Sequence, residues 1–138
     1  MAYTTINDPQ KHFNTVLYTG NQLSHPIVGV GFQPDFVWGK VRSHTGTHTW
    51  YDSTRGNTKQ LEADTGNAES TQNTMLSSFD SDGFTVGSSA EVNGSTNDMV
   101  SWSWKANGAG VLNEVGDIDS TVSVNTTSKF SIVKWTGN

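Results

Sequence analysis

Two histidines and an aspartate recur at steps of four residues in the stretch from His44 through His48 to Asp52. Residues four apart on a β-strand share one face, so these three side chains are a candidate set of metal ligands. Gly46 interrupts the strand between the two histidines, and no glutamate stands beside them as a general base. The alternative is a solvent-exposed hairpin, and we therefore predict no metal site.

A second stretch, Asp80-Ser81-Asp82-Gly83, begins like a calcium-binding loop. A complete loop needs further oxygen ligands at its fifth and twelfth positions, and Thr85 and Glu91 match this requirement poorly. Asp and Gly are equally the residues of a β-turn, because Asx side chains bond to their own backbone and Gly allows a positive φ. The sequence favours the turn, and we predict no cofactor.

Two tryptophans, Trp102 and Trp104, stand two residues apart and share one face of a predicted strand. Exposed indoles can bind sugar rings through their aromatic faces, but paired aromatics are also common in protein cores. We favour the core for both, and for Trp38.

Nothing in the sequence supplies an activated nucleophile. No serine lies in a Gly-x-Ser-x-Gly motif, and no pair of carboxylates has the spacing expected for glycoside cleavage. Glu62, Asp64 and Glu69 lie in an aperiodic stretch, residues 62–73, that predicts an exposed, mobile loop. We therefore predict that the protein is not an enzyme and has no catalytic residues.

Short strands must position these residues. The 138-residue chain has 18 Thr, 14 Gly and 12 Asn, and only 15% of its residues are charged. This composition favours strands and tight turns over helices. We predict an all-β fold, a two-sheet jelly-roll or concanavalin-like sandwich over residues 13–138, preceded by a polar arm over residues 1–12. The predicted core consists of Phe13, Leu17, Val30, Phe32, Phe36, Trp38, Phe79, Phe84, Val86, Val100, Trp102, Trp104, Phe130, Ile132 and Val133.

Charge and composition exclude several classes of partner. The net charge of −5 argues against a nucleic-acid partner, which would require a basic patch. No apolar run approaches the ~20 residues of a membrane-spanning helix, so we expect no membrane partner. The absence of cysteine excludes a disulfide framework.

The end of the chain nearly repeats a stretch close to its start. Residues 130–138 match residues 13–21 at five of nine positions, with Trp135 in place of Tyr18. Both segments read as a strand that runs into a Thr-Gly-Asn turn. Either the chain holds one module and the opening strand of a second, or the two terminal strands of one module are alike.

Several blocks of the sequence, taken in order, resemble a repeat domain of unknown function in virion proteins of tailed bacteriophages, notably cyanophages. These blocks are residues 1–9, 13–21, 32–40, 52–56, 78–87 and 100–106. The resemblance implies a concanavalin-like jelly roll on the particle surface, in tail fibres or other appendages, and it brings no catalytic residues. Ser103 departs from the pattern, in which Cys is common, and the chain stops where a second copy would begin.

A chain of this size resembles a capsid decoration, or cement, protein more than a long fibre. We therefore expect a non-enzymatic virion surface protein that is assembled in the host cytoplasm and binds capsid or tail subunits. The alternative is a tail-fibre or appendage adhesin that binds host-surface glycan. An assembly protein should expose apolar residues at an interface, whereas a lectin should present a shallow groove with an exposed aromatic residue.

The candidate interface residues are Tyr3, Ile6 and Pro9 in the arm and Trp135 in the last strand. The arm has no core of its own to join, so we expect it to order on a neighbouring subunit. The last predicted strand has one charged residue, Lys134, and so leaves a sheet edge open to pairing. A homo-oligomer, a dimer or trimer, is expected.

Overall fold

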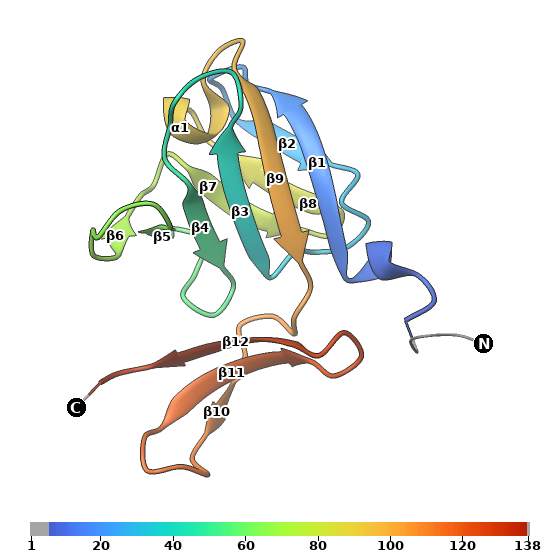
Figure 1. The fold of residues 1–138 in the computed structure, drawn as a ribbon, viewed down its shortest axis with the longest axis vertical. Coiled ribbons are helices and arrows are strands. Elements are labelled where there is room, and N and C mark those ends of the chain that lie inside the picture. Colours follow the sequence, from blue (N-terminus) through green and yellow to red (C-terminus); the bar gives the residue numbers. More distant parts are fainter. Residues whose placement is uncertain (1–5, 138) are drawn as a thin grey trace.

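The computed structural model describes residues 6–137. The chain is 44% strand and 5% helix, which confirms the all-β prediction. Its strands form three antiparallel sheets (Figure 1). Two of the sheets pack face to face as a sandwich, and the third lies at one end of it.

The largest sheet has six strands in the order β1-β9-β3-β4-β5-β6. These strands are β1 (Phe13–Thr19), β9 (Asp98–Trp104), β3 (Phe36–Val41), β4 (Thr49–Asp52), β5 (Lys59–Glu62) and β6 (Ser70–Thr71). The facing sheet has three strands, β2 (His25–Val28), β8 (Gly83–Val86) and β7 (Leu76–Asp80), in that order. A 3-10 turn, η1 (Pro9–Lys11), precedes β1, and one short helix, α1 (Ala90–Asn93), precedes β9.

The core of the sandwich lies between these two sheets. Its buried members come from both sheets, from α1 and from the loops: Ile27, Val30, Phe32, Val37, Tyr51, Met75, Leu76, Phe84, Val86 and Val92. Val16 and Tyr18 pack against this cluster from β1. The predicted core residues Val30, Phe32, Phe84 and Val86 are confirmed, and Val100 is also buried, though outside this cluster.

The predicted turn over residues 80–83 is a tight hairpin between β7 and β8, in which Asp80 pairs with Gly83. Gly83 has a φ of +152°, and a Cβ there would overlap the carbonyl oxygen of Ile27. The Asp82 carboxylate accepts hydrogen bonds from the backbone of Gly29 (3.1 Å) and Gly31 (2.7 Å). The carboxylate thus ties this hairpin to the chain that leaves β2.

The tryptophans predicted to fill the core lie on the opposite face of the six-stranded sheet. In β9, Met99, Ser101 and Ser103 point inward and are buried, whereas Trp102 and Trp104 point outward and are half-buried. Two-residue alternation defines two faces but does not say which one meets the second sheet. We expected the face with the larger residues to be the buried one, and this prediction was wrong.

The same reversal affects the other strands of this sheet. In β3, Trp38 is half-buried on the outer face while Val37 is buried inside. In β1, Phe13 and Leu17 are 38% and 60% exposed, so neither belongs to the sandwich core. Val133, also predicted as core, is 45% exposed in the third sheet.

The dipeptide Asn93-Gly94 is of a type common in hairpin turns, but here it ends helix α1. Ser89 caps the helix, and Gly94 follows it as the C-cap. The Asn93 amide is fully buried and donates to the backbone oxygens of Leu23 (2.6 Å) and Gly87 (2.7 Å). These tertiary hydrogen bonds outweigh the turn preference of the dipeptide.

The predicted loop over residues 62–73 is partly a hairpin, because β5 and β6 pair across it. Residues 63–69 between the two strands are exposed, as predicted. The side chain of Glu62 accepts hydrogen bonds from Thr65 and Asn67 at 2.8 Å each. These bonds hold the loop between β5 and β6 against the end of β5.

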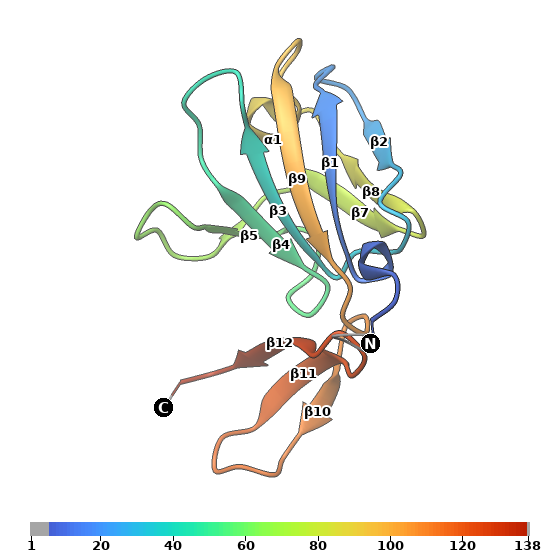
Figure 2. The same ribbon diagram turned by 45° about the vertical axis from the view of Figure 1, so that its right-hand side comes forward.

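The third sheet consists of β10 (Val111–Asn113), β11 (Ser120–Asn125) and β12 (Phe130–Trp135). The last strand was predicted, but the separation of this sheet from the sandwich was not. Figures 1 and 2 show this C-terminal sheet below the sandwich, beyond the lower ends of β9 and β3. The buried Asp35 carboxylate accepts from the backbone of Ala106 (2.7 Å) and Gly108 (3.0 Å), which fixes the crossing into this sheet.

Candidate functional site

Aromatic side chains cover the outer face of the six-stranded sheet. Trp38 is central, with ring centroids 5.4 Å from Trp102 and 5.6 Å from Trp50. Its indole Nε1 donates to Nδ1 of His48 at 3.0 Å. Adjacent antiparallel strands place these rings together, because Trp38 lies opposite both Trp102 and Trp50 in the register.

One end of this aromatic face is covered by the C-terminal sheet. Phe130 of β12 stacks on Trp104, with centroids 6.1 Å apart and planes 23° apart, and its centroid is 6.4 Å from that of Phe36. A hollow of about 380 Å³ remains between the two sheets. It is lined by Phe36, Trp38, Trp50, Asp52, Trp104, Phe130, Ser131 and Ile132.

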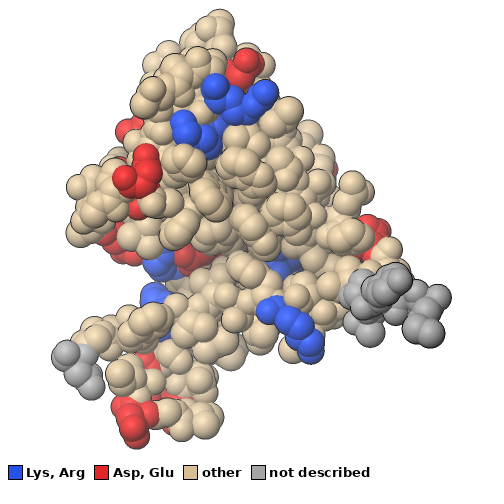
Figure 3. All heavy atoms as spheres, in the orientation of Figure 1, with Lys and Arg blue, Asp and Glu red and all other residues tan. Residues whose placement is uncertain are grey.

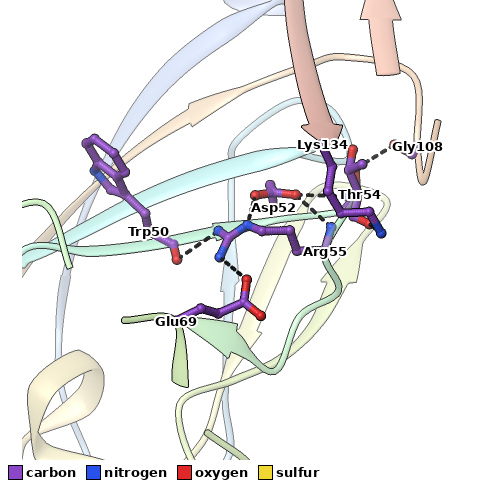
Figure 4. A network of polar contacts seen from close by, with 8 residues as sticks. Trp50, Asp52, Thr54, Arg55, Glu69, Gly108 and Lys134 are labelled. Carbon is purple, nitrogen blue, oxygen red and sulfur yellow. Dashed lines mark hydrogen bonds and ion pairs between the residues drawn. The ribbon is translucent and has the colours of Figure 1, made fainter. Parts of the chain in front are cut away.

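A more polar groove of about 680 Å³ adjoins this hollow. At its centre the Arg55 guanidinium donates to the Asp52 carboxylate, to Glu69 (3.2 Å) and to the carbonyl oxygen of Trp50 (3.4 Å), as Figure 4 shows. Lys134 reaches across from β12 and donates to the carbonyl oxygen of Thr54 at 3.4 Å. The groove therefore joins the sandwich to the C-terminal sheet.

The charges of this groove are largely paired. Both oxygens of Asp52 are engaged, one by the backbone of Thr54 and Arg55 and the other by the Arg55 side chain. The Asp52 and Arg55 side chains are only 6% and 12% exposed, so this ion pair is shielded from solvent. Glu69, at 39%, is more open and presents one oxygen that no intramolecular hydrogen bond occupies among the described contacts.

The three residues considered as metal ligands do not converge. His48 accepts from Trp38, Asp52 pairs with Arg55, and the His44 ring contacts the carbonyl oxygen of Thr45 at 2.7 Å. Within residues 6–137, no group of three or more His, Cys, Asp or Glu side chains is placed to hold a metal ion.

The predicted interface residues fall at two separate places. Ile6 and Pro9 line a hollow of about 360 Å³ beside Phe13, Trp104 and the β11–β12 turn. Trp135 lies near the far end of β12 and is 62% exposed. Tyr3 lies outside the described residues.

Trp135 belongs to a larger apolar surface, which we call the valine face. Val111, Val122 and Val133 lie directly opposite one another across the three strands of the C-terminal sheet. Trp135 and Val124 extend the same face, since each lies two residues from a member of this row. Exposure is 68% for Val111, 45% for Val133 and 41% for Val124.

The valine face points away from the sandwich. Ile132 and Lys134, which alternate with the members of the valine face in β12, line the groove, and Val133 and Trp135 border it as well. Ser123 is fully buried on the inner side of β11, where its hydroxyl accepts from the backbone of Asn107. In Figures 1 and 2, none of the described elements lies beyond the C-terminal sheet on its far side. Of this face, only Trp135 was predicted from the sequence as an interface residue. The spacing of two residues between Val122 and Val124 also indicates an apolar face of a strand.

Charged groups are unevenly placed on the C-terminal sheet. Glu114, Asp117 and Asp119 lie in or beside the β10–β11 loop, and all are exposed. Lys129 lies in the β11–β12 turn at the opposite end of the sheet. Lys134 lies near the acidic end of the sheet, but on the groove side of β12. Figure 3 shows acidic atoms at the free end of the sheet and basic atoms both above that end and toward the other end.

The described residues contain no helix with the length and apolarity that a membrane crossing demands. Comparison with curated proteins finds no match, and comparison with solved structures finds none either. Residues 8–138 match the family described as a domain of unknown function (DUF7483). The match covers nearly the whole chain, which therefore belongs to the DUF7483 family.

Proposed function

We propose that this protein is a non-enzymatic surface component of a tailed-bacteriophage virion. Its role is that of a capsid decoration protein, which binds other virion subunits and stabilises the particle. The bacteriophage context rests on the resemblance of the ordered sequence blocks, and the binding role rests on the valine face. An apolar face of this kind, uncharged and turned away from the rest of the molecule, is typical of a protein-binding surface.

The polar groove supports a binding rather than a catalytic role. Asp52 accepts hydrogen bonds from the Arg55 guanidinium and from two backbone N–H groups, so both of its oxygens are occupied. A catalytic carboxyl group needs an oxygen within hydrogen-bond reach of the substrate. The Asp52–Arg55 pair instead stabilises the loop that faces the C-terminal sheet.

Particle composition tests this proposal. Mass spectrometry of purified particles should find the chain, and quantification should give a copy number comparable to that of capsid subunits. Val111→Ser should lower occupancy on the particle, whereas Val28→Ser should not, because Val28 is equally exposed (67%) but lies in β2 of the sandwich. Absence from the particle, or equal occupancy of both variants, would contradict the proposal.

A second candidate is glycan binding by an appendage adhesin, favoured by the groove beside the aromatic face. Trp38 and Trp50 give half-exposed indole surface, while Glu69 and Lys134 supply an acceptor and a donor at the rim. This pairing of aromatic and polar groups suits the apolar face and the hydroxyls of a sugar.

Titration with host-surface polysaccharide tests this second candidate. Binding that is lost in Glu69→Gln and Lys134→Met, and kept in the exposed control Lys105→Met, would support it. An absence of binding by the unmodified protein would remove it and leave the decoration role unaffected.

A further inference from the structure

We infer that the valine face binds the same face of a second copy of this chain, giving a two-fold dimer in which the two C-terminal sheets stack face to face. This inference deepens the proposed assembly role, because it names the partner of the apolar surface. It is tested on the purified protein alone, so its failure is distinguishable from failure of the virion proposal.

The valine face has a composition that is compatible with its own copy. Besides its valines and Trp135, it carries Asn113, Ser120 and Ser131, so no member of the face is charged. Two identical faces can therefore meet without repulsion between like charges. A two-fold interface requires this self-compatibility, because each patch meets its own copy.

The C-terminal sheet is covered on one side only. Stacked β-sheets pack about 10 Å apart and bury their facing side chains as a core. The C-terminal sheet has such a core on its inner side, where Phe130 contacts Trp104, but its outer side has none within residues 6–137. A second copy of the sheet would supply the missing layer.

The charges at the two ends of the sheet favour one orientation of the dimer. The acidic β10–β11 loop and Lys129 lie at opposite ends of the sheet. A two-fold axis parallel to the strands would bring the acidic loops together. An axis across the strands inverts the partner, and places the acidic end of each copy near Lys129 of the other.

This inverted arrangement also fits the sizes of the side chains. Taking the row of Val111, Val122 and Val133 as its centre, it lays β12 of one copy over β12 of the other. Trp135 lies two residues to one side of Val133, and Ser131 lies two residues to the other side. Inversion therefore sets the largest side chain of one copy over one of the smallest of its partner.

The dimer should be weak. One face of a short three-stranded sheet buries less than the ~1,200 Å² that marks the low end of standard protein interfaces. We expect a dissociation constant on the order of micromolar, which is common for interfaces of this size. Such affinity is sufficient where many copies are held close together on a surface.

Sedimentation equilibrium between about 1 and 500 µM tests the inference. The unmodified protein should show a monomer–dimer equilibrium. Val133→Asp should weaken association at least about tenfold, because it places a carboxylate in the centre of the interface. Val28→Asp is the control, because Val28 is an exposed valine of the sandwich (67%, against 45% for Val133), and it should associate like the unmodified protein. Urea unfolding of each variant checks that the fold is intact.

Charge reversal tests the orientation. Lys129→Glu should weaken the dimer about three- to tenfold at low salt, and much less at 0.5 M salt, because exposed charges are screened there. Adding Asp117→Lys and Asp119→Lys to that variant should restore association. A monomer at about 500 µM, or equal loss in Val133→Asp and Val28→Asp, would overturn the dimer. Strengthening by Lys129→Glu alone would overturn the inverted arrangement.

Discussion

The Asn93 side chain is a junction between three segments of the chain. Its amide nitrogen donates to Asn21, Leu23 and Gly87, and its oxygen accepts from the backbone of Asn21 at 2.9 Å. Because Asn93 is fully buried, its amide N–H groups and its side-chain oxygen would lack a partner without these hydrogen bonds. A single amide thus holds together the end of β1, the start of β2 and the end of β8.

Asn93→Asp should therefore destabilise the protein by about 2–4 kcal/mol, because a carboxylate cannot donate to the three oxygens that surround it. Urea unfolding measures this loss in the free energy of unfolding. Asn107→Asp, at an exposed position, makes the same chemical change and should cost little. A cost for Asn93→Asp no greater than that of the control would show that the junction contributes nothing.

The tyrosines of the core make stability sensitive to alkali. Burial raises the pKa of the Tyr18 phenol above its ordinary value of 10.0. Burial, and secondarily the nearby charge of Glu91, raises the pKa of Tyr51 in the same direction. The Tyr18 hydroxyl donates to the carbonyl oxygen of Val92 at 2.6 Å, so its neutral form is also the form that the fold uses.

The sign of the pH dependence follows from these raised pKa values. Below pH 10 both phenols are neutral in the folded and the unfolded chain, and their contribution to stability is complete. Above pH 10 the unfolded chain loses phenol protons that the folded chain retains, so the free energy of unfolding should fall as pH rises. The double variant Tyr18→Phe/Tyr51→Phe should show a smaller fall in urea titrations between pH 9 and 11. An equal fall in both proteins would assign the effect to other groups.

At the scale of elements, the Arg55 network joins β4, the loop after it and the residue before β6. Arg55→Lys should lower the free energy of unfolding by about 1–3 kcal/mol, because lysine cannot reach Asp52, Glu69 and the Trp50 carbonyl together. Thermal or urea unfolding provides the measurement. Arg42→Lys, at an exposed position, is the control and should change stability by less than about 0.5 kcal/mol. Equal effects would mean that the paired guanidinium has no structural role.

Several strands could be predicted from the sequence, but which of their faces would be buried could not. The segments 13–21 and 130–138, predicted as strands that run into turns, contain β1 and β12, and the strand predicted to carry Trp102 and Trp104 is β9. Alternation in β9 was recognised, but the buried face holds Ser101 and Ser103 while the tryptophans lie outside. Burial depends on which face meets a second sheet, and that is a long-range property absent from a local pattern.

The candidate site was harder to predict, because it depends on contacts between distant segments. The groove joins Arg55 to Lys134, and the two lie 79 residues apart in the sequence. The valine face arises only when β10, β11 and β12 align their valines in one row. Trp135 was identified as an interface residue from its strand, yet no local signal showed that the sheet would stand apart from the sandwich.

At the scale of the whole molecule, the sandwich and the C-terminal sheet are joined by a small set of contacts. Asp35 holds the crossing, Ser53 donates to Gly108 at 2.6 Å, and Asn125 donates to the Lys105 carbonyl at 3.1 Å. The sheet has no hydrogen-bonded strand pair with the sandwich among the described strands. It should therefore open at a lower free energy than the sandwich.

Asp35→Asn tests the crossing. The substitution keeps the shape of the side chain but replaces an acceptor oxygen by a donor that faces a backbone N–H of Ala106 or Gly108. We expect faster hydrogen exchange over residues 106–110 and a loss of about 1–3 kcal/mol in the free energy of unfolding. Asp98→Asn, at an exposed position, should leave both quantities unchanged. Unaltered exchange at residues 106–110 in Asp35→Asn would contradict this role.

Phe130 provides an apolar contact between the sandwich and the C-terminal sheet, since its ring packs on both Trp104 and Phe36. Phe130→Ala removes this contact but leaves the sandwich core untouched, because Phe130 lies outside the cluster between the two sheets. Hydrogen exchange should therefore accelerate in β11 and β12 while the slowest amides of β3 and β9 keep their rates. Val124→Ala, on the outward face of the same sheet, should leave exchange nearly unchanged in the dilute monomer. Uniform acceleration through both parts in Phe130→Ala would mean that they unfold as one cooperative unit, and that the C-terminal sheet cannot move independently of the sandwich.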